Sequence, residues 1–133
     1  YSTLVRASDE DLLNIFNTGN PDEAWEKVSP FSAVLVYTAN AGGVYLRSSS
    51  LSFHMDVERI EPISTIGAGD TFNAGLLYGI WKMGYGREQL KILNRSQWEE
   101  ILAIAIQFSR EVCLSYDNYL PLDYAQKIKQ FKP

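Results

Sequence analysis

The chain has 133 residues, enough for one ordinary domain with its own core. Its hydrophobic content of 46% and charged content of 21% are globular values, and its net charge of −4 gives no electrostatic argument for nucleic acid or an anionic membrane. A single cysteine excludes an internal disulfide, and no apolar run is long enough to span a bilayer. We therefore expect a cytoplasmic protein with no nucleic-acid or membrane partner.

The first part of the chain alternates short strands and helices. Residues 1–7 read as the tail of a strand and its exit loop, and Ser8 is a good N-cap for a helix that begins with three acidic residues. Pro21 opens a second helix, as proline favours the first helical position. Residues 33–38 form a continuous apolar run, which predicts a buried parallel strand.

The middle of the chain has the pattern of a hairpin after a turn. A glycine-rich turn at 39–43 precedes residues 44–47 and 51–55, which we expect to pair, and residues 57–63 read as a further strand. His54, the only histidine, has no partner for a catalytic triad and is predicted to be structural.

Long helices dominate the remainder. The apolar spacing predicts a helix over 70–83 and another that begins with a capping box at Ser96, and a last helix follows Pro121. Four aromatic side chains are expected in the core: Trp25, Phe72, Trp81 and Trp98.

The stretch 64–75 carries the chemistry. Gly67 and Gly69 let the backbone turn sharply, and the first N–H groups of the following helix have no internal partner. Together these groups form an anion site, with the Asp70 carboxylate at its lip. An anion hole beside a carboxylate indicates phosphoryl transfer. On spacing alone, a simple turn with Asp70 as the helix cap explains the pattern equally well.

The same residues match a family signature. Thr65-x-Gly67-Ala68-Gly69-Asp70-x-Phe72 resembles the D-T-x-G-A-G-D-x-F pattern of the ribokinase-like sugar kinases, the PfkB family, with small residues following on the helix. The resemblance implies that Asp70 is the catalytic base and that the backbone of Gly67, Ala68 and Gly69 is the anion hole. It also implies ATP and Mg²⁺ as the phosphoryl donor and its metal ion.

One position departs from the pattern. Ser64 stands where the family has an Asp that helps to hold a monovalent cation. A neutral hydroxyl is a much weaker ligand for a hard cation than a carboxylate, so Ser64 is a weak cation candidate and potassium activation is doubtful.

The resemblance extends to three other segments. The strand and turn that contain Thr38, Asn40 and Gly43 are similar to the family's strand-turn-strand under the nucleotide, although an ordinary turn explains this segment equally well. Asp11 falls on the position of a Glu that acts through water on magnesium, although helix capping by this segment is the stronger interpretation. Ser115 opens a polar loop that would lie near the adenine.

The fold class predicted is α/β, the C-terminal part of a ribokinase-like three-layer domain with a mostly parallel sheet. The resemblance covers only the C-terminal half of the family, so we expect residues 1–133 to be the nucleotide-binding and catalytic part of a longer kinase, inactive alone and prone to self-association. The function implied is ATP-dependent phosphorylation of a small sugar, with fructose as the default. The alternatives are a nucleoside kinase of the same fold and a non-catalytic nucleotide- or anion-binding fragment.

Overall fold

The computed structural model describes residues 2–39, 42–57 and 68–113. The chain divides into two compact units, one made of Tyr1–Glu58 with Gly86–Arg95 and the other of Arg59–Tyr85 with Ser96–Pro133. Apart from Val57, the strand predicted at 57–63 lies outside the described residues, as does the helix predicted after Pro121. None of the helices in the described ranges combines the length and apolar character needed to cross a membrane.

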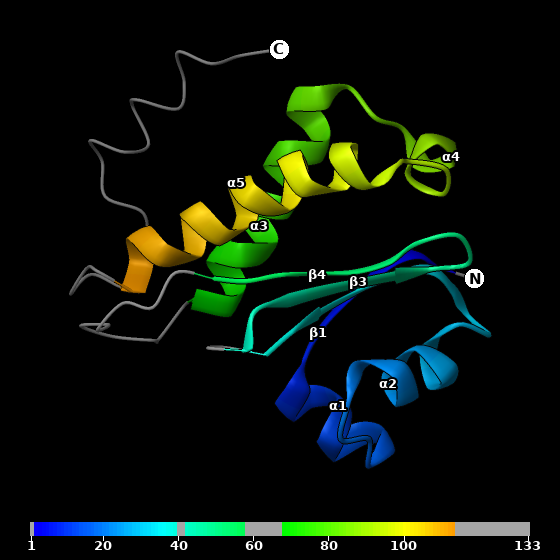
Figure 1. The fold of residues 1–133 in the computed structure, drawn as a ribbon. Helices are drawn as coiled ribbons and strands as arrows, with labels where there is room; N and C mark the ends of the chain where they lie inside the picture. The colour runs from blue at the N-terminus through cyan, green and yellow to red at the C-terminus, as the bar shows by residue number, and fades with distance from the viewer. Residues whose placement is uncertain (1, 40–41, 58–67, 114–133) are drawn as a thin grey trace. The chain divides into compact units, whose positions relative to one another are not determined.

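The first unit is built on a sheet of four strands in the order β1-β2-β3-β4 (Figure 1). Strand β1 pairs with β2 in parallel, whereas β2–β3 and β3–β4 are antiparallel. The predicted hairpin is present, and the predicted α/β class is confirmed. The sheet was predicted to be mostly parallel, but in the described residues only the β1–β2 pair is parallel. The strand bounds are β1 Ser2–Ser8, β2 Ser32–Thr38, β3 Val44–Ser48 and β4 Ser52–Met55.

Helices α1 (Asp9–Phe16) and α2 (Pro21–Val28) connect the two parallel strands. A parallel pair needs such a crossover, because a tight turn can join only antiparallel strands. Ser8 caps α1 as predicted, and Asn20 caps α2, with Pro21 at the start of that helix. A short helix that the sequence pattern did not suggest, α4 (Arg87–Leu90), also belongs to this unit.

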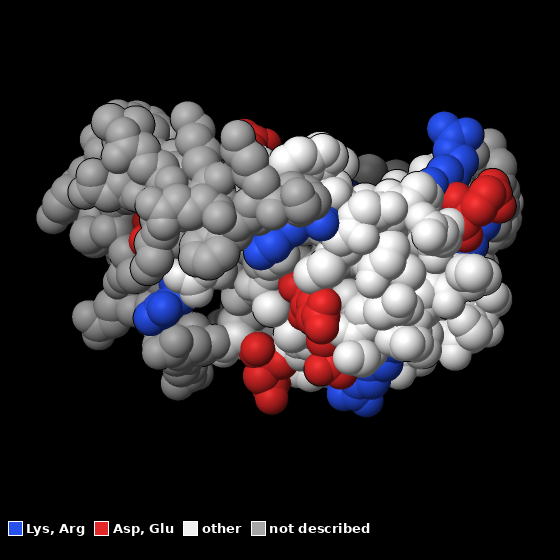
Figure 2. Space-filling view, turned by 90° about the horizontal axis from the view of Figure 1, so that it is seen from above, with Lys and Arg blue, Asp and Glu red and all other residues white. Residues whose placement is uncertain are grey.

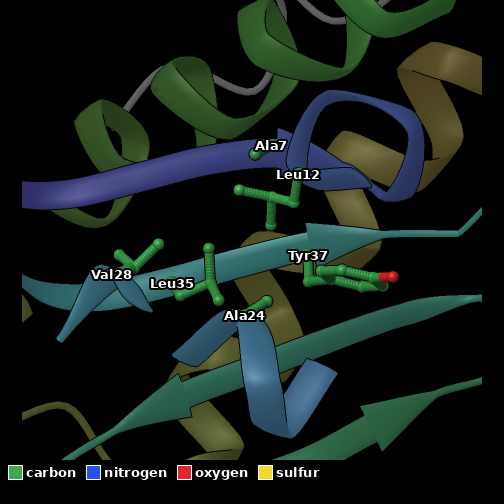
Figure 3. Close-up of a cluster of buried hydrophobic side chains, with 6 residues drawn as sticks. All are labelled: Ala7, Leu12, Ala24, Val28, Leu35 and Tyr37. Atoms are coloured by element: carbon green, nitrogen blue, oxygen red, sulfur yellow. The ribbon is translucent and has the colours of Figure 1, made fainter. Parts of the chain in front are cut away.

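The two crossover helices and one face of the sheet share a hydrophobic core (Figure 3). Ala24 of α2 and Leu35 of β2 have no exposed surface, and Leu12 of α1 is 2% exposed. Burying an aliphatic side chain of the size of leucine contributes about 1.5–3 kcal/mol. This core therefore fixes α1 and α2 against β1 and β2. Its members are Ala7, Leu12, Ala24, Val28, Leu35 and Tyr37.

The second unit contains helices α3 (Ala68–Met83) and α5 (Arg95–Cys113, in this unit from Ser96). The apolar residues whose helical spacing predicted helix α5 are buried: Ile101, Leu102, Ala105, Phe108 and Val112. Helix α5 begins at Arg95, one residue before the cap predicted at Ser96.

The prediction that Trp81 lies in the core is also wrong. Its side chain is 57% exposed, and Leu77, one helical turn earlier, is 67% exposed. The buried residues of α3 are Thr71, Phe72, Gly75, Leu76 and Gly79. Residues four apart share a helix face, so Trp81 and Leu77 lie together away from this buried side. Phe72 and Trp98, by contrast, are buried as predicted, and Trp25 is half-buried.

Helices α3 and α5 approach closely at Gly75. A Cβ atom on Gly75 would lie 2.8 Å from the Cα of Ala105 and 2.9 Å from the ring of Phe108. At Gly79 the nearest atoms, all of Ile101, would be 3.3–3.4 Å away. The first position has no room for a methyl group unless the backbone of α5 shifts, whereas the second needs only a small adjustment.

We predict that Gly75→Ala destabilises the protein by about 1–3 kcal/mol, the usual cost of overpacking a core. Gly79→Ala is the matched control. There the gain of about 1 kcal/mol in helix propensity offsets most of the crowding. Urea denaturation of both variants measures the difference. Equal stability of the two variants would contradict the close approach at Gly75.

Candidate functional site

The first turn of α3 holds the described part of the glycine motif. The helix begins at Ala68, two residues before the predicted start, so Ala68, Gly69 and Asp70 all lie in its first turn. The first N–H groups of a helix have no partner within it and carry partial positive charge. Asp70 is exposed at this positive end. Gly67 and Ser64 lie outside the described residues.

A second group of predicted residues lies at the edge of the sheet where β1 and β2 end. Parallel pairing places Ser8, the last residue of β1, opposite Thr38, the last residue of β2. In open α/β sheets, ligands bind at the carboxyl ends of the strands. Thr38 is therefore at the edge where a ligand is expected, and Asn40, two residues further on, lies outside the described residues.

Gly43 closes the turn that follows Thr38. Its carbonyl accepts a hydrogen bond from the N–H of Ala39 at 2.9 Å, and its φ of +92° lies in the left-handed region. A Cβ atom on Gly43 would collide with the carbonyl of Met55 and lie 2.6 Å from Nε2 of His54. Only glycine fits this position, because both its dihedral angle and its surroundings exclude a side chain.

His54 holds the same turn from strand β4. Its Nε2 lies 2.6 Å from the carbonyl oxygen of Gly42, a distance that requires this nitrogen to be the N–H donor. Its ring stacks on Tyr45 with centroids 4.2 Å apart. These contacts are what a structural histidine makes, in keeping with the sequence-based interpretation of His54.

Asp11 is tied to the start of α1 by a capping box. Its N–H donates to the Ser8 hydroxyl at 3.1 Å, and its Oδ2 accepts from the Ser8 N–H at 3.0 Å. The hydrogen bonds from Ser8, and then the positive charge of Arg6, lower the pKa of Asp11 below its ordinary value. The structure therefore confirms that this segment caps the helix. The lowered pKa favours the ionised form of the Asp11 carboxylate.

Arg6 is a residue that the sequence pattern did not single out. Its Nη2 donates a hydrogen bond of 2.8 Å to Oγ1 of Thr38, although the two residues are 32 positions apart. The sequence held one signal for Arg6. It is a positively charged residue near the end of the predicted first strand, and the segment with Asp11, a predicted site residue, follows that strand. Arg6 adds positive charge to the edge where β1 and β2 end.

The predicted site residues that lie in the described part of the chain thus form two groups. Thr38, Gly43 and Asp11 lie in the first unit, and the residues of the first turn of α3 lie in the second. Ser115 lies outside the described residues. Within the described ranges, no cluster of three or more His, Cys, Asp or Glu side chains could hold a metal ion. Charged side chains of both signs are interspersed among uncharged ones on the face in Figure 2.

Sequence comparison identifies the family. An α/β protein with a glycine motif at a helix start matches the family model described as pfkB family carbohydrate kinase, over residues 1–123. The chain therefore belongs to the pfkB family of carbohydrate kinases. A comparison with curated protein sequences gives no significant match.

Solved structures of kinases share the fold. A fructokinase from Xylella fastidiosa with bound ATP matches with a TM-score of 0.78 and 18% identity, covering 96% of this chain and 42% of its own. An aminoimidazole riboside kinase from Salmonella enterica, complexed with aminoimidazole riboside and an ATP analogue, matches with a TM-score of 0.74 and 17% identity, covering 97% and 41%.

A double-mutant fructokinase from Vibrio cholerae O395, bound to fructose, ADP and a potassium ion, matches with a TM-score of 0.70 and 21% identity, covering 85% of this chain. The chain spans 35% of that fructokinase and less than half of the other two kinases. These likenesses establish the fold.

The crowding around Gly43 in the turn after β2 predicts how a substitution there changes stability. Gly43→Ala should destabilise the protein by more than about 1 kcal/mol, because it adds a collision to an unfavourable φ. Gly84→Ala is the control, since Gly84 has a φ of +74° but open space around its Cβ position. Chemical denaturation compares the two. A Gly43→Ala variant as stable as Gly84→Ala would contradict the contacts described for this turn.

The lowered pKa of Asp11 predicts how the stability that this residue contributes depends on pH. Because folding lowers the pKa of Asp11, its stabilisation is present above the unfolded pKa of about 3.9 and is lost as the pH falls through the lower folded value. Asp11→Asn should cost about 0.5 kcal/mol at pH 7. The difference from the wild type should shrink progressively below pH 4.

Glu10→Gln, in the same helical turn but outside the capping box, is the control for the loss of one negative charge near the helix start. Denaturation curves between about pH 2 and pH 7 provide the measurement. An Asp11→Asn difference that stays constant across this range would show that the carboxylate is not stabilised by the cap.

Proposed function

We propose that the protein transfers the γ-phosphoryl group of ATP to a hydroxyl of a small sugar. The observation that carries this proposal is the first turn of α3 in a member of the pfkB family, where exposed Asp70 stands beside the N–H groups of Ala68 and Gly69. Negative charge that builds up on the transferring group is stabilised by such donors. A carboxylate at the same place can take the proton of the attacking hydroxyl.

In this mechanism the acceptor hydroxyl gives its proton to Asp70 as its oxygen attacks the γ-phosphorus in line with the leaving ADP. The N–H groups of Gly67, Ala68 and Gly69 bind the oxygens of the transferring group. Thr38, Asn40, Gly43 and Ser115 would hold the nucleotide. Most of the acceleration in such transfers comes from positioning and charge stabilisation.

Asp11 fits a role toward magnesium through water. Its lowered pKa favours the ionised carboxylate, and of its two oxygens it is Oδ2 that accepts the hydrogen bond from the Ser8 N–H. Magnesium keeps several water ligands and binds with few carboxylates and the substrate phosphates, so a single acidic residue suffices. When bound, the ion neutralises charge on the phosphates. Ser64 would bind a monovalent cation only weakly, so we propose little dependence on potassium.

The acceptor is proposed from the structural neighbours. Two of the kinases compared are fructokinases, which supports a hexose such as fructose. The riboside kinase favours the second candidate, a nucleoside or riboside. We further propose that residues 1–133 supply the nucleotide-binding and catalytic part of a cytoplasmic enzyme, and that residues which choose the acceptor lie outside this range, so that the isolated chain is inactive.

Replacing the base tests the proposal. In the full native protein, Asp70→Asn keeps the shape of the side chain and removes the proton acceptor. We predict a fall in kcat of about 10²–10⁴-fold, the usual contribution of a positioned base, with little change in ATP affinity. Glu100→Gln, an exposed acid on α5, is the control.

Steady-state assays with ATP and a panel of sugars and ribosides, together with calorimetric titration of ATP, separate the two effects. A near-native kcat for Asp70→Asn would reduce Asp70 to a helix-cap residue and reject the assignment.

A further inference from the structure

The side chain of Arg6 extends toward the carboxyl edge of the sheet. Arg6 pairs with Val36 in the parallel register, two residues before Ser8 and Thr38 end their strands. Its guanidinium nevertheless reaches Oγ1 of Thr38, with Nη2 at 2.8 Å. The positive charge is therefore delivered to the edge where ligands of α/β proteins bind.

The direction of this hydrogen bond is fixed by chemistry. Arginine has five N–H donors and no acceptor, so the Thr38 hydroxyl must be the acceptor. A hydroxyl that accepts through a lone pair keeps its single proton for a bond in another direction. Arg6 thereby sets Thr38 as a donor, and a donor is what a phosphate oxygen needs.

Arg47, the other arginine of the sheet, makes contacts of a different kind. Its Nη1 donates to the backbone carbonyls of Leu46 and Phe53, and its Nε lies 3.3 Å from the Asp22 carboxylate on α2. These bonds join strands and helix within the unit. Arg6, by contrast, bonds to a side chain at the end of a strand. The two arginines thus offer a matched pair, one at the proposed site and one that braces the fold.

We propose that Arg6 is a positioning residue for the nucleoside triphosphate, because it orients the Thr38 hydroxyl to donate to a phosphate oxygen. This inference rests on the proposed function and adds a residue to it. Arg6 acts through Thr38, and both residues form one unit whose effect appears in the affinity for ATP. In this proposal Arg6 and Thr38 affect neither the rate of phosphoryl transfer at Asp70 nor the affinity for the acceptor.

A double-mutant cycle in the full native protein tests the proposal. Arg6→Met and Thr38→Val should each raise the KM and the Kd for ATP by about tenfold, as loss of a hydrogen bond to a charged group does. The double variant should be no weaker than Thr38→Val alone, because the proposal has the arginine act through the hydroxyl. In Arg6→Met, kcat and the KM for the acceptor should stay within about twofold, because the proposal assigns Arg6 to ATP affinity through Thr38.

Three further variants separate positioning from bracing. Arg6→Lys keeps a charged donor and should restore most of the ATP affinity. Arg47→Met should lower the unfolding temperature and leave ATP affinity unchanged. Arg6→Gln keeps a neutral donor with a smaller change in packing, and it replaces Arg6→Met in the cycle if that variant does not fold.

Two results would overturn the inference. The first is a loss of stability in Arg6→Met, or in Arg6→Gln if that replaces it, with an unchanged Kd for ATP, which would make Arg6 a brace like Arg47. The second is additive losses in the double variant, which would show that Arg6 does not act through Thr38. If Asp70→Asn abolishes transfer while the Arg6 variants bind ATP normally, the proposed function stands and only this inference fails. A wild-type protein that binds no ATP would reject both.

Discussion

The parallel pairing of β1 with β2 is the constraint on which the first unit depends. Parallel strands cannot be joined by a tight turn, so the chain must cross over through α1 and α2, whose apolar faces pack on the sheet. The same pairing puts Ser8 and Thr38 side by side at one edge. The helix cap, the arginine contact and the glycine turn all gather there because the two strands end in register.

The second unit solves a different problem, the close packing of two long helices. Gly75 lets α3 approach the backbone of α5 at Ala105, and the buried stripe of α5 completes the contact. A helix held along its length has a fixed first turn, and the N–H groups of that turn cannot pair within the helix. Packing thus keeps in place the end of α3 where Asp70 lies, and that end is where we propose the chemistry occurs.

Local signals in the sequence predicted local structure well. Ser8 and Pro21 mark helix starts through capping and ring geometry, and the hairpin follows from alternation around a turn. Long-range features were harder to predict. The hydrogen bond from Arg6 to Thr38 depends on a strand register that no local pattern encodes. Trp81 is apolar and lies in an apolar helix, yet its face is exposed. Composition does not tell which side of a helix packs, so the prediction for Trp81 failed. The glycine motif carried the family resemblance in the sequence, because its spacing is long and specific, and the family model matches residues 1–123.

The most direct test of the account is to identify the product of the reaction. The full native protein would be incubated with ATP, Mg²⁺ and separate samples of fructose, other hexoses, ribose and ribosides, and the phosphorus-containing products followed by ³¹P NMR. We predict that one of these acceptors becomes a phosphate monoester in equal amount to the ADP formed. Release of inorganic phosphate with no phosphorylated acceptor in any sample, or ATP left unchanged throughout, would contradict it.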